Sequence, residues 1–163
     1  MSERVSKINY YLDIAEIVSE RSTCLRKHYG AIIVKNDVIV ATGYNGAPRG
    51  RKNCVDVGDC IRERLSIPRG ERYELCRSVH AEANAIIAAP RDQMLGATLY
   101  VACTDPKDGG VVGGTCCCAM CKRTVINAGI ETVVIRDTKT EYRTVNVSEW
   151  IENDDSLDGS FGY

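Results

Sequence analysis

The chain has 163 residues, of which 44% are hydrophobic and 26% are charged. This composition excludes an intrinsically disordered protein, and the length predicts a single domain over residues 1–163 with one hydrophobic core. Lys and Arg residues number 21 and Asp and Glu residues number 22, so the net charge of −1 argues against binding to nucleic acid or to a membrane surface.

The N-terminal half is predicted to contain one helix and one β-hairpin. Apolar residues recur at helical spacing over residues 7–20, which indicates an amphipathic helix. Two β-branched runs, 31–34 and 38–43, flank a Lys-Asn-Asp turn and predict a hairpin. Residues 44–76 then lose periodicity and carry several Gly and Pro residues, so we expect a long irregular insertion there.

The C-terminal half is predicted to alternate helices and strands. The expected elements are a helix over 80–89 that ends before Pro90, a strand over 98–103, a Gly-rich loop over 105–115, a helix over 118–128 that ends at Gly129, and a strand over 131–135. Residues 148–163 are acidic and Gly-rich, and we expect a frayed tail there. This order predicts a layered α/β or α+β protein in which helices pack on a central sheet.

The expected cellular compartment determines how the cysteines are interpreted. The longest apolar runs are too short to span a bilayer, and the first residues lack the charged-then-apolar pattern of a signal peptide, so we expect a cytoplasmic protein. The chain has nine cysteines. An odd number of cysteines in a reducing compartment disfavours a disulfide framework and indicates metal binding.

Two short motifs carry the residues best suited to bind and use a metal ion. His80 and Glu82 open one predicted helix, and Cys118 and Cys121 open another, where they lie on one helical face. One His and two Cys suit zinc and leave its fourth coordination position open, as in catalytic zinc sites. A carboxylate so close to a metal ligand can take protons from water and return them. The competing interpretation is that Glu82 has no catalytic role and only stabilises the positive N-terminal end of the helix.

The His-x-Glu and Cys-x-x-Cys motifs are those of zinc-dependent deaminases. With four further segments, they make the chain resemble the deoxycytidylate (dCMP) deaminase branch of the cytidine/deoxycytidylate deaminase superfamily over about residues 8–136. The segments are STCLR (22–26), GAIIV (30–34), ATGYNGAPRG (41–50) and CRSVHAEANAI (76–86). The chain departs from the family pattern at Cys117, which replaces a proline and offers an alternative ligand, and in a longer 105–115 loop.

The resemblance implies a three-layer α/β/α sandwich whose mixed central sheet has about five strands. It also implies hydrolytic deamination of dCMP to dUMP and ammonia, which supplies dUMP for thymidylate synthesis. In that reaction His80, Cys118 and Cys121 hold the zinc that activates water, and Glu82 moves the proton to N3 and then to the departing amine.

The resemblance further implies which residues bind nucleotides. Asn45 and Arg26 match family positions that contact the nucleotide and its phosphate, and the backbone near Ala81 is implied to hold O2 of the base. The implied effector site comprises Gly43, Tyr44, Asn45 and Gly46. It would bind dCTP as activator or dTTP as inhibitor, with Mg²⁺ on the triphosphate, in a homo-oligomer that the resemblance makes a hexamer. Two plainer interpretations stay open: Asn45 as a turn former, and Arg26 as an exposed residue that binds nothing.

Four further cysteines flank the predicted insertion: Cys24, Cys54, Cys60 and Cys76. A structural zinc held by four thiolates would anchor this otherwise unsupported segment. The family resemblance implies a second zinc that is bound partly by Cys24 and Cys54. The alternatives are unligated thiols, or a site to which His28 contributes.

Three other functions stay open. A tRNA adenosine deaminase shares the zinc motif, but it would be expected to be basic and to lack the pattern over residues 22–50. A cytidine or deoxycytidine deaminase would need no phosphate site, so Arg26 separates it from a dCMP deaminase. A non-catalytic zinc- or nucleotide-binding accessory module would have no use for Glu82 as a proton carrier.

Overall fold

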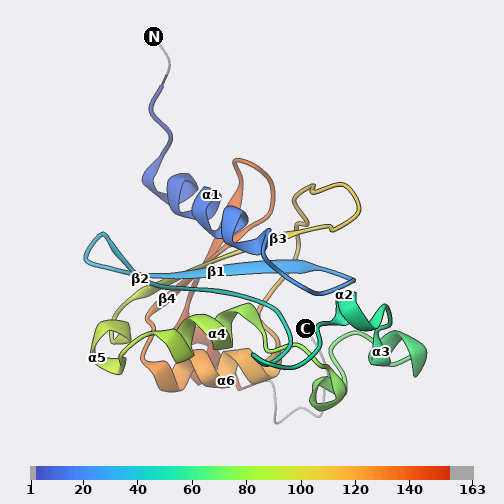
Figure 1. Ribbon diagram of the computed structural model, residues 1–163. Coiled ribbons are helices and arrows are strands. Elements are labelled where there is room, and N and C mark those ends of the chain that lie inside the picture. Colours follow the sequence, from blue (N-terminus) through green and yellow to red (C-terminus); the bar gives the residue numbers. More distant parts are fainter. Residues whose placement is uncertain (1–2, 155–163) are drawn as a thin grey trace.

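The computed structural model describes residues 3–154, which form a five-stranded sheet with helices on both faces (Figure 1). The strands are β1 (His28–Lys35), β2 (Val38–Tyr44), β3 (Thr98–Thr104), β4 (Thr132–Arg136) and β5 (Tyr142–Asn146). Their order across the sheet is β2-β1-β3-β4-β5. The predicted three-layer α/β/α sandwich with a mixed sheet is therefore confirmed.

The sheet is mixed because one of its strand pairs is parallel. β1 pairs antiparallel with β2 and with β3, and β5 pairs antiparallel with β4. β3 and β4 run parallel, so the chain must cross over between them, and it does so through a helix. That crossover helix begins at the predicted Cys-x-x-Cys motif, which places the motif at one end of the sheet.

The helices divide between the two faces of the sheet. The helices are α1 (Lys7–Ser19), α2 (Cys54–Val57), α3 (Ile61–Arg64), α4 (Ala81–Ala88), α5 (Arg91–Met94), α6 (Ala119–Ala128) and α7 (Val147–Glu152). α1 covers one face, while α4 and α6 lie side by side on the other (Figure 1). No helix among residues 3–154 is both long and apolar enough to cross a membrane.

The side chains of the central strand β1 point alternately to the two faces of the sheet, which explains why both faces are covered by helices. In β1, Ile32 and Val34 are buried against the α1 side, whereas Ala31 and Ile33 are buried in the core that contains residues of α4 and α6. Successive side chains of a strand point to opposite faces, so this apolar run fills two cores at once.

A glycine lets the helix with the His-x-Glu motif approach the sheet closely. A Cβ atom at Gly43 of β2 would lie 2.4 Å from the carbonyl oxygen of Ala81 and 2.4 Å from the amide nitrogen of Ala85. Both contacts are with the backbone of α4, which cannot move aside cheaply. Gly43 therefore fixes the position of α4, and with it the first turn of the candidate site.

The predicted insertion between β2 and α4 contains short helices without any strand. It includes α2, α3 and a 3₁₀ turn over Tyr73–Leu75. The buried guanidinium of Arg62 stabilises it, because Nε and Nη2 donate to the carbonyl oxygens of Glu71 and Pro68 and Cζ lies 4.3 Å from the centre of the Tyr73 ring. In Figure 1, α2 and α3 lie together beyond one end of the sheet.

The prediction of a frayed tail from residue 148 is wrong for its first part. β5 and α7 follow β4, and Val147 at the start of α7 is buried in the core. Trp150 packs against that core, and the Lys122 ammonium lies 5.6 Å from the centre of its ring. Two apolar side chains one helical turn apart therefore hold α7 in place, and residues 155–163 lie outside the described part of the chain.

Candidate active site and metal centre

The His-x-Glu motif lies at the N-terminus of α4. His80 is the N-cap residue, in extended conformation, and Glu82 is in the first turn. The segment before it is fixed by a bridge in which the amides and carbonyls of Gly46 and Val79 exchange hydrogen bonds of 3.2 and 2.7 Å. The Asn84 side chain donates to the Tyr44 carbonyl oxygen at 2.8 Å, which ties α4 to the end of β2.

The Cys-x-x-Cys motif lies at the N-terminus of α6, and it meets His80. Cys118 is the N-cap residue of α6, and Cys121 lies one turn further on. Both Sγ atoms lie 3.4 Å from Nδ1 of His80. Within residues 3–154, these three form the one group of three or more His, Cys, Asp or Glu whose ligand atoms all lie within 4.8 Å of one another.

This donor set fits zinc. Imidazole nitrogen and thiolate sulfur are its usual ligands, and three protein ligands leave a fourth position for water or substrate. Cys118 and Cys121 are almost fully buried, so a bound ion would be shielded on the protein side. Cys117 lies outside the group. Burial and the neighbouring Glu82 carboxylate raise the pKa of its thiol well above the usual value, which opposes ligation by Cys117.

The three ligands share protons in the metal-free protein. Burial favours neutral His80, but hydrogen bonds to Cys118 and Cys76 outweigh it and raise the His80 pKa to about 10. A hydrogen bond from Cys121 lowers the pKa of Cys118, against the effect of burial. The same bond, together with burial, raises the pKa of Cys121. At neutral pH the group therefore holds an imidazolium, one thiolate and one thiol.

This distribution predicts a proton release that changes little with pH. Zinc needs neutral imidazole and two thiolates, so binding should release about two protons, one from His80 and one from Cys121, at about pH 5.5 and equally at about pH 8.5. Independent ligands with ordinary pKa values would release about three protons at the lower pH and about one at the higher. Calorimetric zinc titrations in buffers of different ionisation enthalpy measure the number. A fall from three to one would contradict the shared-proton arrangement.

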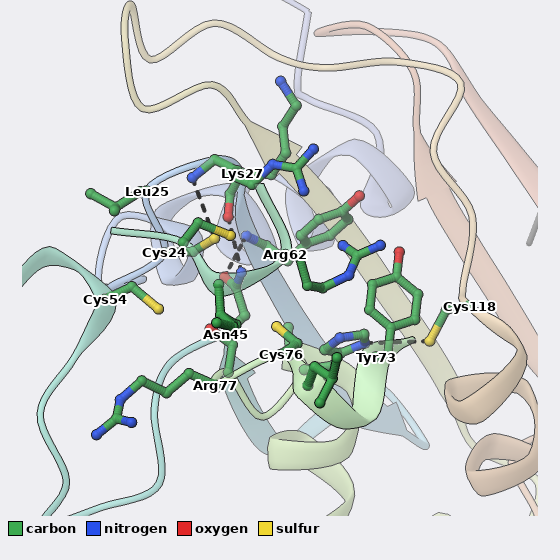
Figure 2. Close-up of a pocket in the computed structure, with 18 of the residues that line it drawn as sticks. Cys24, Leu25, Lys27, Asn45, Cys54, Arg62, Tyr73, Cys76, Arg77 and Cys118 are labelled. Atoms are coloured by element: carbon green, nitrogen blue, oxygen red, sulfur yellow. Dashed lines mark hydrogen bonds between the residues drawn. The ribbon is translucent and has the colours of Figure 1, made fainter. Parts of the chain in front are cut away.

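Glu82 is a buried carboxylate beside the three ligands. It is 5% exposed, and it acts electrostatically on His80, Cys117 and Cys121. His80, Glu82 and Cys118 all line one cavity of about 840 Å³, part of which is drawn in Figure 2. The cavity is large enough for a mononucleotide-sized ligand. Val112, Gly113 and Thr115 also line it, so the Gly-rich loop borders the site as expected.

The other predicted substrate residues line the same cavity, but their side chains are engaged. Oδ1 of Asn45 accepts hydrogen bonds from Ser22 Oγ (2.5 Å) and the Tyr29 amide (2.8 Å), while Nδ2 donates to the Lys27 carbonyl oxygen (2.9 Å). These bonds tie Asn45 to residues 22–29, and neither Asn45 nor Gly46 adopts a positive φ, so local turn chemistry does not account for Asn45. Arg26 is partly exposed and pairs with Glu63 at 2.9 Å.

The four flanking cysteines line the cavity without forming a compact group. Cys24, Cys54, Cys60 and Cys76 all contribute to its wall. Burial raises the Cys54 pKa, and the other three thiols add to the increase, so the four lie in one neighbourhood. His28 uses Nε2 to contact the Cys24 carbonyl oxygen at 3.0 Å.

The sequence did not indicate Tyr73 and Arg62, which lie near His80 in the cavity wall. Tyr73 packs edge-on against His80, with ring centres 5.0 Å apart, and the Arg62 guanidinium lies over the Tyr73 ring. Both come from the aperiodic insertion, where no repeating pattern distinguishes a buried residue from an exposed one. A cluster of Arg residues was the one available signal, and it does not indicate which of them is buried.

A mixed five-stranded sheet that carries a His–Cys–Cys group and a buried carboxylate at two helix N-termini defines the class of zinc-dependent deaminases. Comparison with known proteins identifies the family within this class. The sequence profile of the "Cytidine and deoxycytidylate deaminase zinc-binding region" matches residues 5–137. The chain therefore belongs to the cytidine and deoxycytidylate deaminase family.

Three similar proteins illustrate the relationship. The deoxycytidylate deaminase of Mycobacterium phage D29 is 39% identical over 131 residues, which cover 77% of this chain and 90% of the phage protein. That of Schizosaccharomyces pombe is 32% identical over 131 residues, 80% of this chain but 37% of the yeast protein. The crystal structure of dCMP deaminase from cyanophage S-TIM5 in complex with dCMP and dUMP has a TM-score of 0.52 at 26% identity, covering 84% of this chain and 85% of the phage chain.

Proposed function

We propose that this protein is a zinc-dependent hydrolase that converts dCMP and water to dUMP and ammonia, and so supplies dUMP for thymidylate synthesis. The observation that carries the proposal is the convergence of His80, Cys118 and Cys121 near the buried Glu82, at the wall of a cavity that His80, Glu82 and Cys118 line. The deoxycytidylate deaminases among its relatives, and the phage enzyme solved with dCMP and dUMP, support the choice of substrate.

Each residue of the site has a role in this reaction. His80, Cys118 and Cys121 would hold zinc, which when bound lowers the pKa of a water ligand toward neutrality. The Glu82 carboxylate takes a proton from the attacking water and passes it to N3 of the cytosine while the oxygen adds to C4. Glu82 then takes the second proton from the hydroxyl now on C4 and gives it to the amine, so the C4–N bond breaks, ammonia leaves and the C4 oxygen becomes a carbonyl. Burial keeps bulk water from competing for these protons.

The first turn of α4 is suited to hold the base. The first N–H groups of a helix have no partner within the helix and lie at its positive end. Ala81 is the first residue of α4 and lines the cavity, which supports the proposal that its amide donates to O2 of the cytosine. Asn45 would then act chiefly by keeping the end of β2 in place beside the nucleotide, through its three side-chain hydrogen bonds.

The proposal extends to a second metal site, to effectors and to assembly. A second, structural zinc would draw together Cys24, Cys54, Cys60 and Cys76, which share one cavity wall but do not surround a common point. Effector binding of dCTP or dTTP with Mg²⁺ at the 43–46 turn, and assembly into a hexamer, rest on family resemblance alone. Nine free thiols, two of them metal ligands, suit the reducing cytoplasm. We place all of these functions in one deaminase domain.

Ammonia release tests the proposed reaction. Zinc-loaded protein is incubated with dCMP, deoxycytidine, dCTP or a tRNA adenosine stem-loop, and we expect turnover of dCMP above all others. Turnover of the stem-loop alone would indicate an adenosine deaminase, and equal turnover of deoxycytidine would indicate a nucleoside deaminase. No turnover of any substrate, with or without dCTP, would favour a non-catalytic accessory module.

A further inference from the structure

The cavity of the candidate active site is more basic than the chain as a whole. Its wall includes seven basic residues, Arg26, Lys27, Arg51, Arg62, Arg64, Arg69 and Arg77, and three acidic residues, Asp59, Glu74 and Glu82. The whole chain has a net charge of −1. A concave wall with an excess of one charge concentrates ligands of the opposite charge, so this cavity favours an anion.

Several of these cations are neutralised by partners at the rim. Arg26 pairs with Glu63 at 2.9 Å, and Arg64 pairs with Asp59 at 3.3 Å. Lys27 pairs with Asp105 at 3.4 Å. All three are partly exposed, with 38–63% of each basic side chain accessible, so water and their partners already satisfy them.

Arg62 differs from these residues because it is buried and has no acidic partner. It is 5% exposed, and no Asp or Glu of residues 3–154 forms an ion pair with it. Nε and Nη2 donate to main-chain carbonyl oxygens of Glu71 and Pro68 at 2.8–3.2 Å. These neutral acceptors fix the guanidinium in place without a carboxylate beside it. Of residues 3–154, only the face of the Tyr73 ring and the nearby Cys76 thiol offset its charge, so a bound anion would stabilise it further.

One nitrogen of Arg62 remains available for that anion. Nη1 makes no hydrogen bond within the described part of the chain, and it is not among the buried polar atoms that lack a partner. It is therefore still accessible, and the residue lines the cavity. Arg62 thus presents a pre-oriented, positively charged donor to the interior of the site.

The distance from the metal ligands suits the phosphate of a bound nucleotide. The Arg62 Cζ atom lies 4.3 Å from the centre of the Tyr73 ring, and that centre lies 5.0 Å from the centre of the His80 ring. Cζ is therefore at most the sum of these two distances, about 9.3 Å, from the His80 ring. Figure 2 shows Arg62 beside Tyr73 on the side of the pocket where Cys118 lies, whereas Arg77 extends away from them.

We propose that Arg62 binds the 5′-phosphate of the substrate and makes the enzyme select a nucleoside monophosphate over a nucleoside. The proposal rests on cytosine deamination as the function of this site. A base whose reacting carbon lies near His80 carries its phosphate one sugar away, toward Arg62. Guanidinium groups bind phosphate through directed, charge-assisted hydrogen bonds, and the carbonyls of Glu71 and Pro68 hold this one ready. Arg26, which the resemblance implies as the phosphate ligand, would remain a rim residue.

Selectivity between two substrates tests the assignment. We compare kcat/KM for dCMP and for deoxycytidine in the wild type, Arg62→Gln, Arg62→Lys and a control, Arg64→Gln, which removes a paired, exposed charge from the same helix. Loss of a charge-assisted hydrogen bond should lower kcat/KM for dCMP by about 10- to 100-fold in Arg62→Gln, with a change under about threefold for deoxycytidine. Arg62→Lys should retain part of the selectivity, and Arg64→Gln should retain all of it.

Three outcomes would overturn the assignment. One is an equal fall for both substrates in Arg62→Gln, which would mean that Arg62 only supports the insertion. Another is a selectivity that survives in Arg62→Gln and is lost in Arg26→Gln. The third comes from binding: the Kd values of zinc-loaded protein for dCMP, deoxycytidine and inorganic phosphate are measured by calorimetry. Arg62→Gln should weaken the binding of dCMP and of phosphate but not the binding of deoxycytidine. Unchanged Kd values would contradict the proposal. The binding measurement does not depend on turnover. An inactive wild type would therefore refute the deaminase function, and the Kd values would still test whether Arg62 binds the phosphate.

Discussion

Replacing Glu82 with Gln is expected to lower kcat for dCMP by about 10²- to 10⁴-fold, because the amide cannot take a proton from water or return it to the base. Gln has nearly the shape of Glu, so the packing at this 5% exposed position should change little. The proposed zinc ligands, His80, Cys118 and Cys121, are unchanged in this variant, which should therefore keep its zinc. Ammonia release and zinc content, measured on the same preparation, check both statements.

A matched control separates this effect from a general loss of negative charge in the cavity. Glu74 lines the same cavity, is exposed, and pairs with Arg72 at its rim. Glu74→Gln should leave kcat and zinc content unchanged. If Glu82→Gln retained more than about a tenth of the wild-type kcat, its role as the proton carrier would be untenable.

Replacing Arg136 with Met is expected to lower the free energy of unfolding by about 3–5 kcal/mol, since it removes one partner of a buried charge network. The Arg136 side chain is fully buried at the end of β4, and Nη1 donates to Asp13 of α1 at 2.8 Å. Nη2 donates to the backbone and side-chain oxygens of Asn9 at 3.2 Å. Without the guanidinium, Glu16, which is 13% exposed, would lose a cation 3.7 Å away.

Urea unfolding of zinc-loaded protein measures this change. The control is Lys139→Met, which removes a second cation that contacts Glu16 but is 69% exposed. An exposed ion pair contributes about 0–1 kcal/mol, so the control should lie close to the wild type. Equal destabilisation by the two substitutions would show that the contribution of Arg136 to stability does not depend on its burial.

Local patterns in the sequence predicted those parts of the fold and site that depend on local chemistry. The helix over 7–20, the hairpin, and the end of α6 at Gly129 are confirmed, and Gly129 adopts the left-handed conformation, with φ of 81°. The three metal ligands come together because each motif opens a helix, and both helices cover the same face of the sheet.

Other features were invisible in the sequence because they depend on distant contacts. β5 exposes most of its side chains, so it lacks an apolar alternation, and α7 is a short acidic segment held by Val147 and Trp150. Arg26 and Arg62 are both arginines in polar surroundings of the chain. Only their contacts in the folded protein distinguish them. Arg62 is buried against the Tyr73 ring and has no acidic partner within residues 3–154, whereas Arg26 forms an ion pair with Glu63.

The position of the metal ligands links metal supply to the lifetime of the protein. His80 and Cys118 are 38 residues apart, so an ion that binds both joins α4 to α6 and closes a long loop. The unfolded chain holds no such preformed site, and binding energy therefore adds directly to folding energy. In a cell short of zinc, a larger share of the chains would open and reach proteases. Abundance, as well as catalytic rate, would then follow the free zinc concentration.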